Sequence, residues 1–533
     1  MKSICSVRAH PMFYLAAVAL IGIGSVGSGA AAATAGAAGA TGVTHNDGSS
    51  EQQWVGVWTG VNEQTEGRFH ARSLVDFRIS AGPTGLEFQD LDRMRGSSAP
   101  VKMTVQGQQF SAEYFGLWPT SIHVAGTLAA GGKSLDVTIS GDGMTGLETR
   151  HAILSHDDQK ARAFLAPLID AAGARVTSYR YRPPVSRPDG IAVASAKAEG
   201  IDTKPLEQMV ASILQETGVR EEVQTESVLI QRHGKLVFEQ YFWGQSGDNP
   251  HVISSVTKSV TSILTGIAFD RGGIQLDAPV TSYIADPQST VWGQKGYAIT
   301  LRNILSMSSG TVWDDRVAGA NNPSAQLLVT PDITRYVMGS AQIHPPGTFY
   351  NYDNGLPALT GILVARKVGE PFDRFADTNL FGPLGISNYR WTRVREGGVL
   401  AAGGFYMLPR DMVKIGQLML QGGLWNGRRV VSAEWVREAT RQQTAAGQYP
   451  YGFYWHLTNA QQRHVQGEDG FMGLGQGGQV IAVFPGLDMV VVVTSQNWLS
   501  RELQAMPFGL FDRFVLPAAR GFDKDHRDQA GRP

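Results

Sequence analysis

The strongest constraint on the fold is a change in apolar periodicity along the chain. From residue 53 to about residue 172, apolar and polar residues alternate in short runs, and glycines such as Gly107 separate them. Examples of these runs are residues 54–58, 73–79, 101–105 and 135–139. Such alternation is typical of antiparallel strands, so we expect a small all-β domain, a barrel or a sandwich, over residues 53–172. Trp54 and Trp58 at its start are interpreted as core anchors rather than ligand contacts.

The rest of the chain has a mixed pattern. Residues 173–199 are predicted to be a linker, because the adjacent Pro183 and Pro184 favour extended chain. Between residues 200 and 519, helical stripes lie between strand-like runs, which occur at 227–231, 235–241, 479–484 and 488–494. This order predicts an α/β (α+β) domain whose sheet is built from both ends of the domain and flanked by helices.

The first 34 residues have the pattern of an export signal. Lys2 and Arg8 give a positive start, residues 13–26 are apolar, and residues 30–33 are alanines that offer a cleavage site. The alternative is an uncleaved membrane anchor, but the apolar stretch is shorter than the roughly 20 residues of a spanning helix. We therefore expect a periplasmic or secreted protein with no stable membrane span after cleavage. Residues 35–52 would be a flexible spacer and residues 520–533 a disordered tail.

Composition excludes several classes of protein. The 533 residues suggest two to four domains of about 100–200 residues each. A formal net charge of −1, without a basic stripe, argues against nucleic acid as a partner. No Cys/His cluster has metal-ligand spacing, so we expect no metal and no cofactor. The only cysteine, Cys5, lies in the export signal, which excludes a thiol nucleophile and disulfides from the mature chain.

A serine and a lysine three residues apart, Ser255 and Lys258, carry the clearest chemical signal. No other Ser-x-x-Lys occurs among the 533 residues. Because residues i and i+3 share one face of a helix, the hydroxyl and the amine would lie within reach of each other. A desolvated lysine with a lowered pKa can serve as the base that activates a serine nucleophile. The structural alternative is a Ser-Ser helix cap followed by a solvated lysine.

Tyr352-Asp353-Asn354 is the only Tyr-x-Asn in the chain. A phenol beside a Ser–Lys pair can take the serine proton and pass it to a leaving group, and the asparagine can orient the lysine or a substrate amide. In the structural alternative, Tyr352 packs in a turn and Asn354 caps the helix that begins near Leu356. Asp353 is interpreted as a turn residue.

A glycine-rich run precedes the first strand of a predicted C-terminal hairpin. After Gly475 it consists of Gln476, Gly477, Gly478 and Gln479. Glycines there let a strand edge approach a substrate closely, and the next backbone N–H can complete an oxyanion hole with that of Ser255. Taken alone, the run is typical of an ordinary turn.

In this order, the three segments resemble the serine β-lactamase and penicillin-binding-protein superfamily. The resemblance is closest to its class C-like branch, which includes D-alanyl-D-alanine carboxypeptidases, family VIII-type esterases and 6-aminohexanoate-dimer hydrolases. It covers roughly residues 200–515 and leaves the β domain out. It implies a β-lactamase/transpeptidase-like fold, an antiparallel sheet flanked by helices together with an all-helical subdomain.

The resemblance also implies an acyl-enzyme mechanism. Ser255 would attack a carbonyl, Lys258 and Tyr352 would share the proton transfers, and the N–H groups of Ser255 and Gln479 would hold the oxyanion. The chain departs from the pattern at Gln476, where β-lactamases and peptidases of this superfamily usually carry a lysine or histidine that helps to hold a substrate carboxylate. We therefore expect a serine hydrolase of a small, less anionic ester or linear amide. The alternatives are a β-lactamase or D-alanyl-D-alanine carboxypeptidase, and a non-catalytic protein that binds cell-wall or peptide ligands.

Overall fold

A computed structural model describes residues 49–520, apart from residues 92–98, 116–120, 142–148, 218–221, 285–291, 293–296, 318–320, 446 and 459–467. The expected export signal, most of the spacer and all but the first residue of the expected tail lie outside the described residues. The last four residues of the expected spacer form a short helix, α1 (Ser49–Gln52). None of the helices in the described part of the chain has the length and apolar character needed to cross a membrane.

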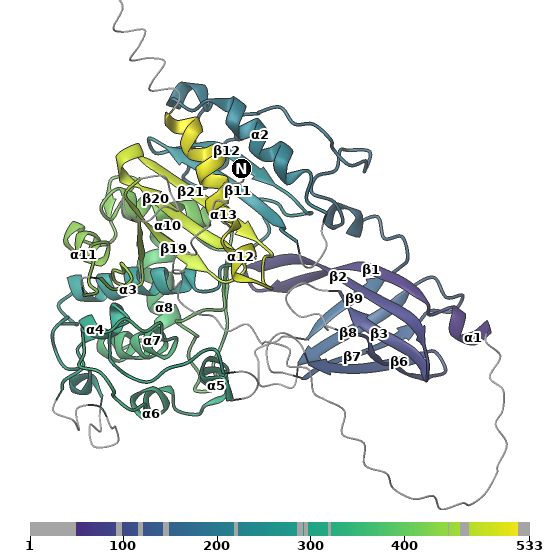
Figure 1. Cartoon of the computed structure of the whole chain (residues 1–533), viewed down its shortest axis with the longest axis horizontal. Helices are drawn as coiled ribbons and strands as arrows, with labels where there is room; N and C mark the ends of the chain where they lie inside the picture. Colours follow the sequence, from purple (N-terminus) through teal and green to yellow (C-terminus); the bar gives the residue numbers. More distant parts are fainter. Residues whose placement is uncertain are drawn as a thin grey trace, which may run out of the picture.

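The N-terminal strands form a closed antiparallel barrel (Figure 1). In chain order they are β1 (Gly56–Glu66), β2 (Phe69–Gly82), β3 (Gly85–Asp90), β4 (Val101–Lys102), β5 (Thr104–Gln106), β6 (Gln109–Phe115), β7 (Ser121–Leu128), β8 (Leu135–Gly141) and β9 (Arg150–Leu154). Each strand pairs with the next, except that β4 and β5 are separated only by Met103 and pair with β3 and β6, respectively. Thr59 and Ser155 close the barrel by exchanging backbone hydrogen bonds of 2.9 and 2.8 Å between β1 and the end of β9. Of the two predicted forms, the barrel is therefore the one observed.

The barrel interior is filled by side chains. Trp54 is 1% exposed and Trp58 is fully buried, and both belong to the apolar cluster inside the barrel. The indole N–H of Trp58 donates to the Trp54 carbonyl at 2.8 Å, so its polar atom is satisfied without a ligand. The two tryptophans are core residues, as their position at the start of an alternating run predicts.

The segment predicted as a linker, residues 173–199, is partly built into the following sheet. Its strand β10 (Ala192–Val193) pairs in parallel with β12 (Lys235–Tyr241) at the sheet edge. The Tyr181 hydroxyl donates to the Val237 carbonyl at 2.9 Å, and its oxygen accepts from the Ala196 N–H at 2.7 Å. These contacts hold the segment against the sheet, a result that adjacent prolines in the sequence do not reveal.

The sheet after this segment has the order β10-β12-β11-β21-β20-β19-β18. Its remaining strands are β11 (Thr225–Arg232), β18 (His456–Thr458), β19 (Gly470–Gly475), β20 (Gln479–Phe484) and β21 (Met489–Ser495). β11 pairs antiparallel with β21, so strands from both ends of the domain meet at the sheet centre, as predicted (Figure 1). Side chains of β21 alternate between two cores, because Val491 packs in one cluster and Val490 and Val492 in the other.

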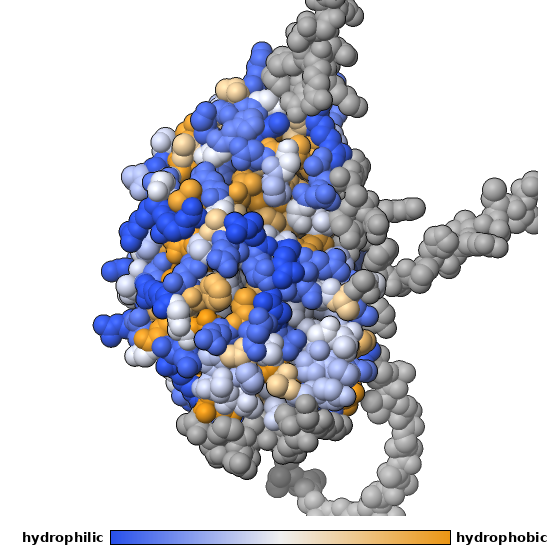
Figure 2. Space-filling model, turned by 90° about the vertical axis from the view of Figure 1, so that its left-hand side faces the viewer, coloured by the Kyte–Doolittle hydropathy of each residue, from blue (hydrophilic) through white to orange (hydrophobic). Residues whose placement is uncertain are grey.

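Helices cover both faces of this sheet. On one face lie α2 (Thr203–Ile213) and the C-terminal helices, among them α13 (Met506–Leu510). On the other lie α3 (Val256–Asp270) and α10 (Pro409–Leu420), followed by a mainly helical region that contains α7 (Gly355–Val368). In the surface view of Figure 2, small hydrophobic patches lie among hydrophilic side chains, as expected for a solvent-facing surface.

The barrel contacts the domain that contains the seven-stranded sheet, close to the start of α3. The amide group of Asn249 exchanges hydrogen bonds of 2.7 and 2.9 Å with the backbone of Arg72 in β2. The Arg390 guanidinium contacts the rings of both Phe69 and Tyr406, 4.8 and 4.5 Å from their centroids. Tyr406 belongs to β15 (Phe405–Met407), which pairs with β13 (His251–Val252) just before Ser255. The barrel is thus attached next to the strand that leads into the nucleophile segment.

Candidate active site

The backbone that carries Ser255 is held in an unusual conformation. Ser254 has a φ of +48°, a left-handed value that is uncommon for a residue with a side chain. Ser255 occupies the N-cap position of α3 without capping through its side chain. Among the described residues its backbone N–H donates to no carbonyl. Both the hydroxyl and the N–H of Ser255 are therefore available at the positive end of the helix.

Lys258 lies one turn further along α3 and is 2% exposed. Its Nζ donates to Ser255 Oγ at 2.8 Å and to the Ala402 carbonyl at 2.7 Å. Burial lowers the pKa of Lys258 to about 7, although the nearby carboxyls of Asp315 and Asp353 act in the opposite direction. This geometry excludes the alternative of a solvated lysine and makes the amine a base that is ready near neutral pH.

Tyr352 completes a three-residue cluster. Its side chain lines the same pocket as Ser255, and its ring centroid lies 5.0 Å from Lys258 Nζ. Burial raises the pKa of Tyr352 above its usual range, so the phenol keeps its proton at neutral pH. The neighbouring Tyr350 instead stacks on Tyr449, with centroids 5.3 Å apart. The structure thus brings together the three residues predicted to be catalytic.

Asn354 stands at the N-cap of α7, but its side chain makes no capping bond. Its Nδ2 donates to Asp315 Oδ2 at 2.7 Å and to Ser324 Oγ at 2.8 Å, while Asp353 accepts the Gly355 N–H at 2.7 Å. The predicted capping role therefore falls to Asp353. Because both amide hydrogens of Asn354 are engaged, its side chain can offer only the carbonyl oxygen to another group.

The glycine-rich run of residues 475–479, which is the third motif of the predicted site, forms a tight turn between β19 and β20. Gly477 and Gly478 both have a φ of +84°, which favours glycine. A Cβ on Gly475 would lie 2.4 Å from the Ile253 carbonyl oxygen, so a side chain there would push β19 away from the nucleophile segment. Gln479 turns its amide inward, where Nε2 donates to the Ser495 carbonyl at 2.6 Å. The Gln479 side chain is therefore engaged by Ser495, although the residue also lines the pocket described below.

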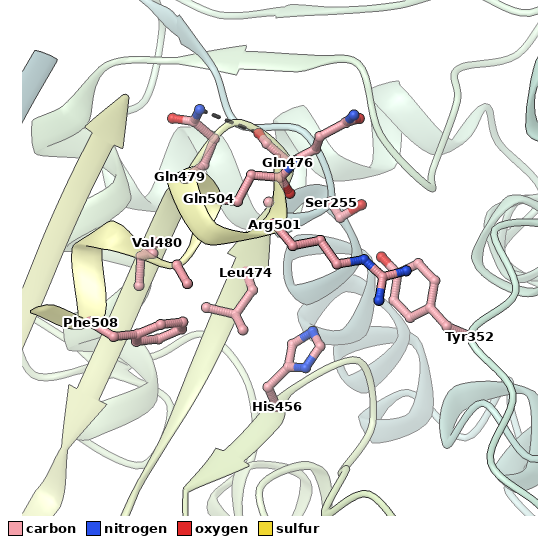
Figure 3. Close-up of a pocket in the computed structure, with 13 residues that line it drawn as sticks. Ser255, Tyr352, His456, Leu474, Gln476, Gln479, Val480, Arg501, Gln504 and Phe508 are labelled. Atoms are coloured by element: carbon pink, nitrogen blue, oxygen red, sulfur yellow. Dashed lines mark hydrogen bonds between the residues drawn. The ribbon is translucent and has the colours of Figure 1, made fainter. Parts of the chain in front are cut away.

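A pocket joins these elements (Figure 3). Its lining consists of Ser255, Tyr352, His456, Leu474, Gly475, Gln476, Gly478, Gln479, Val480, Arg501, Gln504, Ala505 and Phe508. Ser255 and Tyr352 therefore share one pocket with Gln476, Gly478 and Gln479 of the third motif. Gly477 lies at the turn itself and is not among the lining residues.

Two of the lining residues carry chemistry that sequence reasoning missed. His456 on β18 is buried, and burial lowers its pKa to about 3, so the imidazole is neutral. Its Nδ1 lies 3.1 Å from the Tyr449 hydroxyl. Arg501 begins α12 (Arg501–Gln504) and is exposed. Both residues lie about 200 or more positions after Ser255, and no local pattern marks them in the sequence.

The chain matches a known family model. The model of the family described as Beta-lactamase matches residues 210–507, which is more than half of the chain and contains α3, Tyr352 and the third motif. The match stops short of the barrel.

Relatives and solved structures give a consistent result. A 6-aminohexanoate-dimer hydrolase of Paenarthrobacter ureafaciens is 24% identical over 331 residues, or 57% of this chain and 80% of the relative. The D-alanyl-D-alanine-carboxypeptidase/endopeptidase AmpH of Escherichia coli is 25% identical over 203 residues, which are 33% of this chain and 52% of that protein. A structure of a proposed 6-aminohexanoate-dimer hydrolase from Bacillus anthracis has a TM-score of 0.50 at 19% identity, covering 69% of this chain and 96% of its own. At this identity the structural likeness shows the fold alone.

Proposed function

The chain belongs to the beta-lactamase family of serine hydrolases, and we propose that it cleaves a small ester or linear amide through an acyl-enzyme on Ser255. The observation that carries the proposal is the contact of Ser255 Oγ with Lys258 Nζ at 2.8 Å, in a pocket that Tyr352 also lines. A nucleophile, a base near its working pKa and a neutral phenol are the groups that acyl transfer requires.

Acylation would begin with the neutral Lys258 amine. The Lys258 amine takes the proton of Ser255 as Oγ forms a bond to the substrate carbonyl carbon, and the carbonyl oxygen becomes an oxyanion; the protonated Tyr352 would serve as a proton donor. The cluster then passes the proton to the leaving oxygen or nitrogen, the bond to the leaving group breaks, and an alcohol or amine departs. Water adds to the resulting ester, the acid is released, and Ser255 regains its proton.

The oxyanion would be held by backbone N–H groups. The Ser255 N–H stands at the positive end of α3, and the N–H of Gln479, a residue that lines the same pocket, would be the second donor. Loss of one such donor typically costs about 10²–10³ in rate. The left-handed Ser254 supports this assignment, because strained backbone is found where a site needs a fixed geometry.

The neutral Gln476 favours an ester or linear amide over a β-lactam or a D-alanyl-D-alanine peptide. The similarity to a 6-aminohexanoate-dimer hydrolase, which covers 80% of that relative, supports a linear amide. We also propose that residues 1–34 direct export, so that the substrate is a small molecule met in the periplasm or outside the cell. Nucleic acid and a cofactor have no part in the proposal.

The test is hydrolysis of three substrates by the wild type and by Ser255→Ala. They are a short p-nitrophenyl ester, a chromogenic cephalosporin and the linear 6-aminohexanoate dimer. We expect turnover of the ester or the dimer that is lost in the variant, with the cephalosporin the poorest substrate. Failure of all three with a folded protein, together with no labelling of Ser255 by a serine-directed phosphonate, would instead favour the non-catalytic binding protein.

A further inference from the structure

The pocket beside Ser255 has an apolar section and a cationic section. In Figure 3, Leu474, Val480 and Phe508 gather on one side, whereas the Arg501 side chain extends across to the side of Tyr352. The apolar section suits an alkyl or aryl group that avoids water. A guanidinium is suited to a carboxylate, which it can hold through two parallel hydrogen bonds.

Arg501 is the charge that a substrate anion would meet. It is the single arginine or lysine among the described residues that line the pocket. Within the described part of the chain, no carboxylate lies within salt-bridge distance of its side chain. The amine of Lys258 is already held by Ser255 and Ala402, and His456 is neutral. The exposed Glu502 carboxylate interacts with Arg501 only at longer range, so the guanidinium has no ion-pair partner among the described residues and can bind a ligand.

The base of this side chain is fixed. Ser500 caps α12, since its hydroxyl oxygen accepts the Leu503 N–H at 3.1 Å. Gln504 Nε2 donates to the Trp498 carbonyl at 3.3 Å and ties the other end of α12 to the segment that follows β21. A positioned backbone reduces the conformational entropy that Arg501 loses when it binds an anion.

We propose that Arg501 binds a carboxylate on the leaving group of the substrate. The substrate class would then be an ester or linear amide with an apolar acyl arm and an acidic leaving group. This inference rests on the proposed function. Because Tyr352 would protonate the leaving group and Arg501 extends toward Tyr352, the leaving group rather than the acyl arm would carry the carboxylate. The acyl arm would lie against Leu474 and Phe508.

This inference changes the expectation drawn from Gln476. A neutral residue in the third motif predicts a less anionic substrate only if no other element supplies a cation. Here α12 supplies one from beyond β21, at a position that the motif does not include. The substrate carboxylate would be bound by Arg501 of α12 rather than by the residue at position 476, in the turn before β20.

The test uses a matched pair of esters, 4-(hexanoyloxy)benzoate and its methyl ester, which differ in one negative charge on the leaving group. The quantity measured is the ratio of their kcat/KM values, from the absorbance of the released phenols. Arg501→Gln should lower this ratio about fivefold, mainly through KM of the carboxylate, and Arg501→Lys should keep part of the preference. Added salt should lower the wild-type ratio, because the guanidinium is exposed.

The control is Arg428→Gln, which removes the same charge from an exposed position in β17 (Arg428–Arg429) that does not line the pocket. It should leave the ratio at the wild-type value. A ratio that Arg501→Gln does not change, or that Arg428→Gln lowers equally, would overturn the proposal while leaving the acyl-enzyme mechanism intact.

If neither ester is turned over, the proposed hydrolysis fails and the role of Arg501 is judged by binding. The wild type must then bind the carboxylate ester more tightly than the methyl ester by calorimetry, and Arg501→Gln must lose that preference. Equal affinities in the wild type would overturn the inference independently.

Discussion

The Asp315 carboxylate accepts a hydrogen bond of 2.7 Å from the side-chain amide of Asn354, 39 positions further along the chain. Asp315 also accepts from the Trp313 indole N–H at 2.9 Å and from the Ser324 hydroxyl. It is 4% exposed, and burial raises its pKa to about 6. The Asp315 carboxylate is therefore mostly ionised above this pH. It orients Asn354 of the Tyr352-Asp353-Asn354 motif through the hydrogen bond, and it acts electrostatically on Lys258.

Removing this carboxylate should change the pH at which the enzyme becomes active. The Asp315 charge raises the pKa of Lys258, so in Asp315→Asn the rising limb of kcat/KM against pH should move to lower pH. Ser324→Ala removes the hydrogen bond that most lowers the Asp315 pKa, so Asp315 should be less ionised near pH 7 and the limb should move in the same direction by a smaller amount. An unchanged limb, or one at higher pH, in Asp315→Asn would contradict the electrostatic role.

The wild-type pH profile should have one rising limb. If the base is the neutral Lys258 amine, kcat/KM for a p-nitrophenyl ester should increase through pH 7, where its pKa lies, and then level off. Tyr352 has a raised pKa and should cause no fall below about pH 10. The neutral His456, with a pKa of about 3, should add no limb. A decline between pH 7 and 9 would point to a different acid.

The buried lysine should destabilise the fold at neutral and acidic pH. The pKa of Lys258 is about 7 in the folded protein and about 10.4 when unfolded, so the unfolded chain binds more protons between these values. Stability therefore rises with pH across this window, and the penalty is complete below pH 7. Lys258→Met should remove a penalty on the order of 3–5 kcal/mol at pH 6 and less at pH 9.5.

Urea unfolding at the two pH values measures this effect, with Lys204→Met as the control. Lys204 is an exposed lysine in α2, and its replacement should change stability little at either pH. If Lys258→Met destabilises the protein equally at pH 6 and pH 9.5, the lysine is not buried in the neutral form.

A cation in the third motif should extend the activity toward β-lactams. Gln476→Lys places an ammonium in the pocket beside Ser255, where it can hold a β-lactam carboxylate, and we expect turnover of a chromogenic cephalosporin to rise about tenfold. Gln504→Lys adds the same charge at another lining position and should have a smaller effect. No gain in Gln476→Lys with the fold intact would count against the role assigned to this position.

Much of the fold could be predicted because its signals are local. The alternation in β20 and β21 follows from strand geometry, and the apolar stripe after Ser255 follows from helix geometry, so both are readable within a few residues. The choice between barrel and sandwich depended on the pairing of Thr59 with Ser155, which no local pattern encodes. The packing of the predicted linker against the sheet could not be foreseen, because Tyr181 contacts a strand more than 50 positions away.

The residues of the candidate site also differ in whether a local sequence pattern marks them. Ser255, Lys258 and Tyr352 lie in short motifs whose spacing has a chemical meaning, and they are brought together as expected. His456 and Arg501 reach the pocket only through the pairing of β18 with β19 and the position of α12 after β21. The contact of Asn354 with Asp315 could not be predicted from sequence, because Asp315 belongs to a separate loop.

The most direct test of the central claim is to identify the residue that becomes acylated. The wild type is mixed with a short p-nitrophenyl ester, quenched in acid within the first turnover, and analysed by intact mass and peptide mapping. We predict one acyl group, on the peptide that contains Ser255, and none in Ser255→Ala. An acyl group on another residue, or ester hydrolysis that persists in Ser255→Ala at the wild-type rate, would contradict the account.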